Sequence, residues 1–332
     1  MSLEGTSKPL VSVVIPAWNA AEDLSDCIES VFASTYSSVE VIVVDNASTD
    51  ATPGLLASRF PDVKAIRNQE NIGFGGALNQ GSRVAAGEYV VWLNSDAVLP
   101  PRWIEQLVNL LETDSRLGMA TSVVTYREPE NIVWSAGGWV DATTGLTWDH
   151  GKGEDVGAIS IPSNPDYLAA CATMIRRKVL ETLGGLDASY FIYFEDADLC
   201  LRLKTAGYRI AVLDNLAVRH SATSRAGVRK NPASKLFLFA RSNLRFILKN
   251  WPSPRLPLAI FACLVFYLSF ALIKGPRELL PSVLRAITWN VRYLDHTLRA
   301  RGQGSKIRIR SRVPGLLQVA LKLAQRPELY PY

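Results

Sequence analysis

The sequence predicts an α/β fold built on an open, doubly wound, mostly parallel sheet, followed by a helical and basic C-terminal region. Three observations support this prediction. Near-continuous β-branched runs alternate with helical patterns in the first half, as expected for parallel strands buried on both faces. Polar residues gather where these runs end. After about residue 225 the chain changes to long apolar and cationic stretches.

The elements of the first half follow from local patterns. Apolar residues at helical spacing over 24–31 predict a helix that Asn19 would cap. A Gly-containing helix is expected near 74–86, and Pro100 and Pro101 open another. The apolar runs predict strands at 11–16, 39–45, 63–68 and 88–96. This β-α-β-α-β order is typical of an open doubly wound sheet.

The bulk composition is that of a globular protein. The 332 residues exceed one ordinary domain, and 48% hydrophobic with 20% charged residues is enough to bury a large core. Four scattered cysteines, without CxxC spacing or a histidine cluster, predict neither a disulfide framework nor a zinc site. No signal peptide precedes the first apolar run, which begins at Val11, so we expect a reducing, cytosolic location.

Polar residues follow three of the predicted strands, at 16–19, 45–50 and 94–96. Ligands of such sheets bind beyond the carboxyl ends of the strands, so this pattern indicates a site. The first strand is followed by PAWNA instead of a GxGxxG fingerprint, and GFGGALNQG (73–81) lacks the Lys-Ser/Thr of a phosphate loop. A nicotinamide or ATP site is therefore disfavoured.

An acidic group interrupts the aromatic segment YFIYFEDADLCLRLKTAGYRI (190–210). Glu195, Asp196 and Asp198 open a predicted helix that ends near Gly207. They are either favourable first-turn charges or they face something positive, because burying an unpaired carboxylate is costly.

A divalent, oxygen-preferring cation would supply that positive charge. It would sit at Asp96 and carry a substrate diphosphate, and His220 would complete its ligand shell. A buried acid nearby, with its pKa raised by apolar neighbours, would serve as a general base.

The C-terminal region combines apolar and basic stretches. Residues 256–273 carry no charge and would span about 27 Å as a helix, just short of a hydrocarbon core of roughly 30 Å. Residues 277–312 contain nine Lys or Arg against Glu278 and Asp295, which suggests an anionic partner. A core helix, a membrane span and an interfacial helix all remain open. The cations mixed with aromatic residues favour the interfacial helix.

Five ordered segments resemble the inverting family 2 glycosyltransferases of GT-A fold, and most of all the rhamnosyltransferase-like branch that builds bacterial cell-surface polysaccharides. They are VSVVIPAWNA, VDNASTD, NQENIGFGGALNQG, GEYVVWLNSDAVL and GGLDASYFIYFEDADLCLRLKTAGYRI with the later VRH. The resemblance implies a catalytic domain at 10–225, leaving 226–332 as a helical region that we expect to associate with a membrane.

The resemblance also implies a role for each matched residue. Asp45 would accept the imide N–H of uracil or thymine, unless it only forms an Asx-turn. Asp96 and His220 would hold Mg²⁺ or Mn²⁺, and Asp196 would be the catalytic base supported by Glu195. Asn94 replaces the first Asp of the family's DxD motif, which removes one negative charge from the metal site. The nucleotide and sugar pocket would be formed by Pro16, Ala17, Asn19, Asn71, Gly73, Asn79, Asn94 and Ser95.

The predicted function is inverting transfer of a sugar from a dTDP- or UDP-activated donor, with L-rhamnose from dTDP-rhamnose favoured by resemblance. The acceptor would be a lipid-linked saccharide at the cytoplasmic face of the bacterial inner membrane, with the protein bound there as a peripheral or monotopic protein. Partners would include the membrane surface but no nucleic acid. Two sets of aromatic residues remain open between packing and acceptor binding: Trp134, Trp139 and Trp148, and Tyr190, Phe191, Tyr193 and Phe194.

Three alternatives stay open. One is a galactofuranosyl or N-acetylhexosaminyl transferase that uses a UDP-sugar. Another is a nucleotidyltransferase, disfavoured because PAWNA is not a Gly-rich, basic loop. The last is a non-catalytic membrane or nucleic-acid binder using the basic C-terminal region, whose binding would fall steeply with salt.

Overall fold

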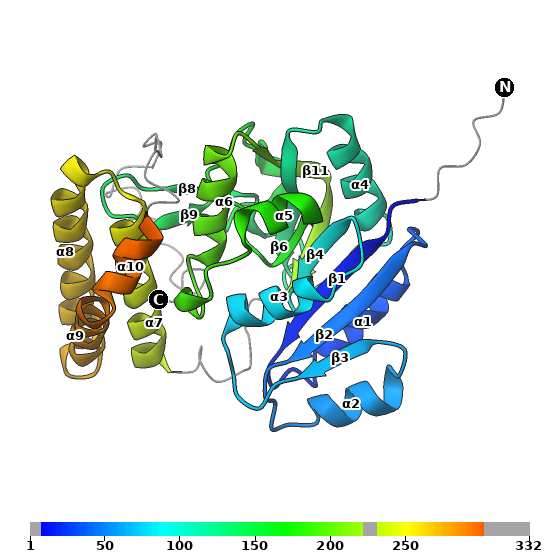
Figure 1. The fold of residues 1–332 in the computed structure, drawn as a ribbon, viewed down its shortest axis with the longest axis horizontal. Coiled ribbons are helices and arrows are strands. Elements are labelled where there is room, and N and C mark those ends of the chain that lie inside the picture. The colour runs from blue at the N-terminus through cyan, green and yellow to red at the C-terminus, as the bar shows by residue number, and fades with distance from the viewer. Residues whose placement is uncertain (1–7, 222–230, 302–332) are drawn as a thin grey trace.

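The structure, a computed structural model, describes residues 8–221 and 231–301 (Figure 1). The strands are β1 (Val11–Ala17), β2 (Val39–Asp45), β3 (Lys64–Arg67), β4 (Tyr89–Leu93), β5 (Ala97–Val98), β6 (Leu117–Tyr126), β7 (Val133–Ser135), β8 (Gly138–Val140), β9 (Thr147–Asp149), β10 (Ala172–Arg176) and β11 (Arg209–His220). The α-helices are α1 (Leu24–Phe32), α2 (Thr52–Arg59), α3 (Phe74–Arg83), α4 (Trp103–Thr113), α5 (Arg177–Leu183), α6 (Glu195–Thr205), α7 (Pro232–Asn250), α8 (Leu256–Lys274), α9 (Pro276–Arg292) and α10 (Leu294–Ala300). Short 3₁₀ turns are η1 (Val156–Ala158), η2 (Ala188–Tyr190) and η4 (Ser253–Arg255).

The central sheet confirms the predicted α/β class. Its strand order is β3-β2-β1-β4-β10-β6-β11-β5, with β7 pairing β6. The strands β3, β2, β1 and β4 are mutually parallel. β10 runs antiparallel between β4 and β6, and β6 is again parallel to β11. The four strands predicted from apolar runs are β1 to β4, so the local patterns identified this half of the sheet correctly.

Helices cover both faces of the sheet, as the doubly wound prediction requires. Alternate residues of β1 face opposite sides. Val13 joins an apolar cluster that includes residues of α1, α2 and α4. Val14 joins a second cluster that includes residues of α3, α5 and α6. The prediction that Asn19 caps the first helix is wrong, because α1 begins at Leu24 and its N-cap is Asp23.

The pairing of β11 with β5 brings distant segments together. Their antiparallel register places His220 opposite Ala97, the residue after Asp96. β11 also runs parallel to β6, so it links this short edge strand to the rest of the sheet.

The C-terminal helices pack onto the α/β half of the molecule and do not form a separate core. The apolar cluster behind α6 continues without a break into α7, α8 and α9. In Figure 1, α7 lies beside α6, and α8 and α9 form the outer edge of the molecule. The domain boundary expected at residue 225 falls within 222–230, outside the described residues.

The helix α8 has two unlike faces. Ala259, Cys263, Tyr267 and Ala271 recur every four residues and are buried, whereas Phe261 is 66% exposed. Within the described ranges, Ser253–Lys274 is the one helical stretch long and apolar enough to cross a membrane by length and composition. The basic segment predicted to continue to residue 312 lies outside the described residues after position 301.

Candidate functional site

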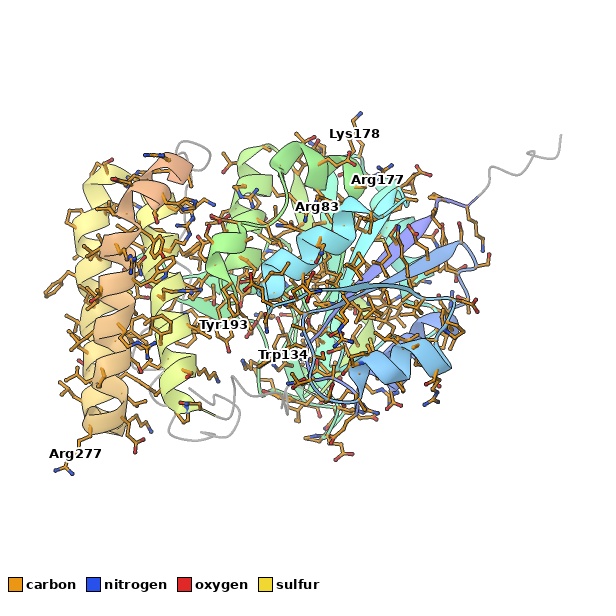
Figure 2. The ribbon with its side chains drawn as sticks, turned by 60° about the horizontal axis from the view of Figure 1, so that its bottom comes forward. Arg83, Trp134, Arg177, Lys178, Tyr193 and Arg277 are labelled. Carbon is orange, nitrogen blue, oxygen red and sulfur yellow. The ribbon has the colours of Figure 1, made fainter. Side chains whose placement is uncertain are left out.

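A cleft of about 570 Å³ opens at the carboxyl ends of β1, β2 and β4. Its size is within the usual range of roughly 300–1,000 Å³ for ligand pockets. Figure 2 labels two of its lining residues, Trp134 and Tyr193, which lie on the side brought forward in that view. Nine residues predicted from the sequence also line it: Pro16, Ala17, Asn19, Asn71, Asn94, Ser95, Asp96, Glu195 and Asp196.

Asn19 ties the end of β1 to the loop after β2. Its Oδ1 accepts a hydrogen bond from Thr49 N (2.8 Å), and its own backbone N donates to Ser48 Oγ (2.9 Å). The φ of Asn19 is 51°, a left-handed conformation that Asn tolerates better than most residues. The side chain therefore shapes the wall of the cleft instead of capping a helix.

Asp45 is buried and is not part of the cleft lining. Its Oδ1 accepts from Ser48 N (2.9 Å), so the turn contact considered from the sequence does form. Its Oδ2 lies 3.6 Å from Arg67 Nε and accepts no hydrogen bond from the described residues. Asp45 Oδ2 is therefore a buried acceptor, behind the wall of the cleft, that receives no hydrogen bond from the described residues.

Asn46 is a site residue that sequence reasoning missed. It lines the cleft, and its Nδ2 donates to Asn71 Oδ1 (2.8 Å) while its Oδ1 accepts from Ile72 N (3.0 Å). The amide therefore joins the end of β2 to the loop before α3. Its place directly after Asp45 at a strand end was the available signal.

Gly73 and Asn79 lie outside the lining and support the loop that precedes α6. The φ of Gly73 is +82°, and a Cβ added there would lie 2.6 Å from Phe191 O. Asn79 Oδ1 accepts a hydrogen bond from the backbone N–H of Leu186 (2.9 Å), and its Nδ2 donates to the carbonyl of the same residue (2.8 Å). Gly73 and Asn79 therefore position the backbone of Phe191 and Leu186 and are not part of the cleft lining.

Asp96 and His220 form a close pair at the cleft. His220 is fully buried, and its Nε2 lies 3.0 Å from Asp96 Oδ1 and 3.3 Å from Asn94 Nδ2. The edge of the Trp134 ring packs against the imidazole, with ring centroids 4.7 Å apart. This arrangement follows from the β5–β11 pairing.

The pair fits part of a metal site. Two neighbouring ligands of an octahedral ion with bonds of about 2.1 Å stand about 3 Å apart, as Asp96 Oδ1 and His220 Nε2 do. Within the described ranges, no group of three or more His, Cys, Asp or Glu side chains gathers as a metal cluster. An ion here would need further oxygens from solvent or from a bound diphosphate, which Mg²⁺ commonly uses.

Glu195 and Asp196 open α6 and both line the cleft. Asp196 Oδ1 accepts from Ala197 N (2.7 Å), and its Oδ2 accepts from Ala170 N (3.3 Å). Burial raises the pKa of Asp196 to about 6, with a further contribution from the charge of Asp149, although the backbone hydrogen bonds oppose the rise. Burial and then the charge of Asp196 raise the pKa of Glu195 well above its usual value.

Burial shifts the pKa of both carboxyl groups upward. The pKa of Asp196, about 6, makes this side chain a carboxylate above that pH. Asp196 therefore has a basic oxygen on the cleft surface at physiological pH. A general base requires this state.

The loop before α6 has an unusual backbone. Phe191, Tyr193 and Phe194 have φ values of 64°, 71° and 70°, a region that non-glycine residues rarely occupy. Phe191 and Tyr193 line the cleft, whereas Tyr190 and Phe194 are buried. The four aromatic residues left open by the sequence are thus divided between core and site.

Helix α7 holds this loop in place. Arg241 and Ser242 both donate to the carbonyl of Tyr190, and Ser242 Oγ also lies 3.0 Å from Ile192 O. On the other side, Phe74 N donates to Phe191 O (2.6 Å). The conformation that presents Asp196 therefore depends on contacts from two distant helices.

Asp198 anchors α6 to α7. Its carboxylate is fully buried and accepts from Arg202 Nε and Lys249 Nζ, both at 2.9 Å, and from Asn250 Nδ2 at 3.0 Å. It does not line the cleft, so this carboxylate supports the packing of α6 against α7.

Of the three tryptophans considered for an acceptor wall, only Trp134 lines the cleft. Trp139 and Trp148 face each other across the β8–β9 pair, away from the lining.

Comparison with known proteins identifies the family. The model described as Glycosyl transferase family 2 matches residues 12–184, just over half of the chain. An N-acetylglucosaminyl-diphospho-decaprenol L-rhamnosyltransferase of Mycobacterium tuberculosis is 26% identical over 263 residues, covering 72% of this chain and 84% of the relative.

Two further relatives are longer than the region they share. An uncharacterized protein of Sinorhizobium fredii is 30% identical over 220 residues, which are 62% of this chain and 23% of that protein. An uncharacterized glycosyltransferase of Rickettsia typhi is 39% identical over 108 residues, which are 32% of this chain and 34% of the relative. The matches thus span about a quarter to a third of these two proteins.

Solved structures share the fold. A mannosyltransferase from Pyrobaculum calidifontis in complex with GDP-Man and Mn²⁺ is 21% identical, with a TM-score of 0.53 over 90% of this chain and 85% of that one. GalNAc-T7 with UDP, GalNAc and Mn²⁺ is 15% identical, with a TM-score of 0.58 over 75% of this chain and 49% of that one. These likenesses establish the GT-A fold. By its family match and its fold, the chain belongs to glycosyl transferase family 2.

Proposed function

We propose that the cleft transfers a glycosyl group from a nucleoside diphosphate sugar to an acceptor hydroxyl with inversion at the anomeric carbon. The observation that carries this proposal is the position of Asp196. It is a carboxylate with a pKa of about 6, and it lines the same cleft as Asp96 and the asparagine-rich wall. One base on the cleft surface suits a single displacement, which needs no covalent intermediate.

The reaction follows from the protonation states. Asp196 takes the proton of the acceptor hydroxyl as its oxygen forms a bond to the anomeric carbon. The bond from that carbon to the diphosphate oxygen breaks on the opposite face, so the configuration inverts. Burial and the charge of Asp196 raise the pKa of the neighbouring Glu195, which favours its neutral form beside the base.

Asp96 and His220 would hold a divalent ion, Mg²⁺ or Mn²⁺, close to Asn94. When bound, such an ion neutralises charge that develops on the departing diphosphate. The support is the 3.0 Å Asp96–His220 pair, together with the Mn²⁺ present in both structural relatives. Asn46, Asn71 and Asn19 would bind the nucleotide side. Asp45, buried behind this wall, would hold the loop after β2 through its bond from Ser48 N.

We further propose L-rhamnose from dTDP-rhamnose as the sugar and a lipid-linked saccharide as the acceptor. The mycobacterial relative supports both, since its name specifies rhamnosyl transfer to a diphospho-decaprenol-linked sugar. The exposed apolar face of α8 supports action at a membrane surface. We propose the cytoplasmic face of the bacterial inner membrane as that surface. A UDP-sugar donor, as in a galactofuranosyl or N-acetylhexosaminyl transferase, is the competing assignment.

Release of nucleoside diphosphate from a panel of sugar nucleotides tests the proposal. The panel contains dTDP-rhamnose, UDP-galactofuranose and UDP-N-acetylglucosamine, each with N-acetylglucosaminyl-diphospho-polyprenol and with Mg²⁺, Mn²⁺ or a chelator. We expect metal-dependent turnover of dTDP-rhamnose that Asp96→Ala abolishes. Turnover of a UDP-sugar alone would replace the donor, undiminished turnover in chelator would exclude the metal, and no turnover of any donor would overturn the function.

A further inference from the structure

Arg241 is a buried cation of α7 that contacts the loop before α6. It is 8% exposed, and its guanidinium donates a hydrogen bond to the carbonyl of Tyr190 in that loop. Helix α9 contacts the same residue from another side. The guanidinium lies over the Trp289 ring, 4.8 Å from its centroid, and Asn290 Nδ2 donates to the Arg241 carbonyl (3.0 Å). Two separate parts of the chain therefore fix the position of this side chain.

The other buried cations where α6 meets α7 have carboxylate partners. Their ion pairs, each 2.9 Å long, are Arg202–Asp198, Arg245–Asp187, Lys249–Asp187 and Lys249–Asp198. Among the described residues, no carboxylate lies within ion-pair distance of Arg241. Because a buried charge without a counter-charge is costly, an anion should lie near Arg241 without touching it.

Glu195 is the acid whose charge acts on Arg241. Burial, and then the charge of Arg245, lower the pKa of Arg241 to about 10, and the charge of Glu195 opposes this fall. Burial and then the charge of Asp196 raise the pKa of Glu195, and the charge of Arg241 opposes that rise. Arg241 Nε and Glu195 Oε2 are both buried, and neither forms a hydrogen bond within the described residues. The two charges therefore interact through the low-dielectric interior and not through a direct contact.

The other groups around the two acids do not supply this positive charge. Asp198 acts on Glu195 from the same helix, and Asp149 acts on Asp196 from β9, and both are negative. The residue of α3 that packs against the Glu195 side chain is Gly75, and the α9 residues at Arg241 are also neutral. Arg241 is thus the strongest cationic influence on Glu195.

We propose that Arg241 is a positioning residue of the transfer reaction, which orients the loop before Asp196 and supplies the buried counter-charge of the Glu195–Asp196 pair. The inference rests on the proposed function and adds to it a role for α7. The bond to the Tyr190 carbonyl orients the loop. The positive charge makes negative charge on the two acids less costly. Arg241 acts through these groups, because it is not part of the cleft lining.

The test compares wild type with Arg241→Met and Arg241→Lys. The quantities measured are kcat and the acid midpoint, the pH at which kcat/KM falls to half of its plateau. Arg241→Met removes the charge, and loss of a cation beside an acid raises the pKa of that acid, so the midpoint should move to higher pH. We expect kcat to fall about ten-fold or more, because the loop loses its bond from Arg241. Arg241→Lys keeps the charge, so it should keep the wild-type midpoint while its kcat falls.

Arg285→Met is the matched control. The guanidinium of Arg285 lies over the same Phe237 ring as that of Arg241, at 4.8 and 5.8 Å from the centroid, but Arg285 is exposed. This variant should keep the wild-type kcat and midpoint. A midpoint that stays in place in Arg241→Met, or moves equally in Arg241→Lys, would overturn the proposal. If Arg241→Met does not fold, Arg241→Lys decides alone: a wild-type midpoint supports the proposal and a displaced one overturns it.

NMR of the carboxyl carbons separates this inference from the proposed function. In protein labelled at glutamate, the Glu195 signal is assigned by its loss in Glu195→Gln. It should titrate at higher pH in Arg241→Met than in wild type. If wild type turns over no donor, the proposed function is rejected. A raised Glu195 titration would then still support the counter-charge, and an unchanged one would overturn it.

Discussion

Glu195 and Asp196 are neighbours in sequence, and burial raises the pKa of both, because an ionised carboxylate loses its hydration there. The sequence indicated these two acids and the Asp96–His220 pair, because they follow predicted strands or aromatic segments. It did not indicate Asn46 or the supporting role of Asn79. Those roles depend on partners that other loops contribute.

The pH dependence of kcat/KM tests the role of Asp196. Its pKa is raised to about 6, and the base must be ionised, so activity is present above pH 6 and is lost as the pH falls through about 6. Asp149→Asn removes a negative charge that contributes to this rise, so the midpoint should move to lower pH. Tyr167 can still donate to the new amide oxygen, as it does to Asp149 Oδ1 at 2.8 Å. A midpoint that does not move in the variant would contradict this electrostatic account.

At the scale of elements, strands β1 to β4 and helices α1, α3, α4 and α6 were predictable because their signals are local runs and periodicities. Two features were not. The β5–β11 register depends on residues more than 120 positions apart, and the left-handed loop before α6 is imposed by contacts from α3 and α7. These two features place Asp96 beside His220 and bring Asp196 to the cleft. The geometry of the proposed site therefore depends on contacts between residues far apart in the sequence.

Gly73 is the N-cap of α3 and lies against Phe191 in the loop before α6. The substitution Gly73→Ala tests this close approach. The added Cβ would lie 2.6 Å from Phe191 O at a φ of +82°. We expect a loss of about 1–3 kcal/mol of stability and a lower kcat, measured by denaturant unfolding and transfer assays. Gly54→Ala is the control, because it lies inside α2 with nothing within 4 Å of its Cβ. It should stabilise by about 0.5–1 kcal/mol. Equal effects at both positions would refute the steric argument.

Asp198 joins α6 to α7, and its removal leaves Arg202 buried without its carboxylate and Lys249 with Asp187 as its remaining acid partner. Asp198→Ala should therefore cost about 3–5 kcal/mol in the free energy of unfolding. Glu130→Ala breaks an exposed ion pair with Arg219 and should change stability by less than about 1 kcal/mol. Chemical denaturation of both variants measures the difference. A loss below 1 kcal/mol for Asp198→Ala would show that the network does not hold the two helices together.

At the scale of the whole molecule, the C-terminal helices have two sides with different surroundings. Their inner side shares an apolar core with α6 and donates hydrogen bonds to the loop that precedes the proposed base, Asp196. Their outer side exposes large apolar residues along α8. Composition alone left a core helix, an interfacial helix and a span open, because it does not reveal which face of a helix packs. The structure shows that only one narrow stripe of α8 is buried.

The exposed face of α8 predicts vesicle binding. Phe261→Gln with Val265→Gln removes two apolar side chains that are 66% and 46% exposed. Sedimentation with phosphatidylglycerol vesicles should show binding weakened about ten-fold or more relative to wild type. Phe32→Gln alters a residue that is 56% exposed on α1 and should leave binding unchanged. Equal loss in both proteins, or none in either, would argue against a membrane face on α8.

The central claim is that Asp196 is the base of an inverting transfer. Single-turnover transfer by wild type and Asp196→Asn, with the anomeric configuration of the product read by NMR, tests it most directly. The account predicts an inverted product and a rate at least about 100-fold lower in the variant, which keeps the shape of the side chain but has no basic carboxylate. A retained configuration, or a variant within a few-fold of wild type, would contradict it.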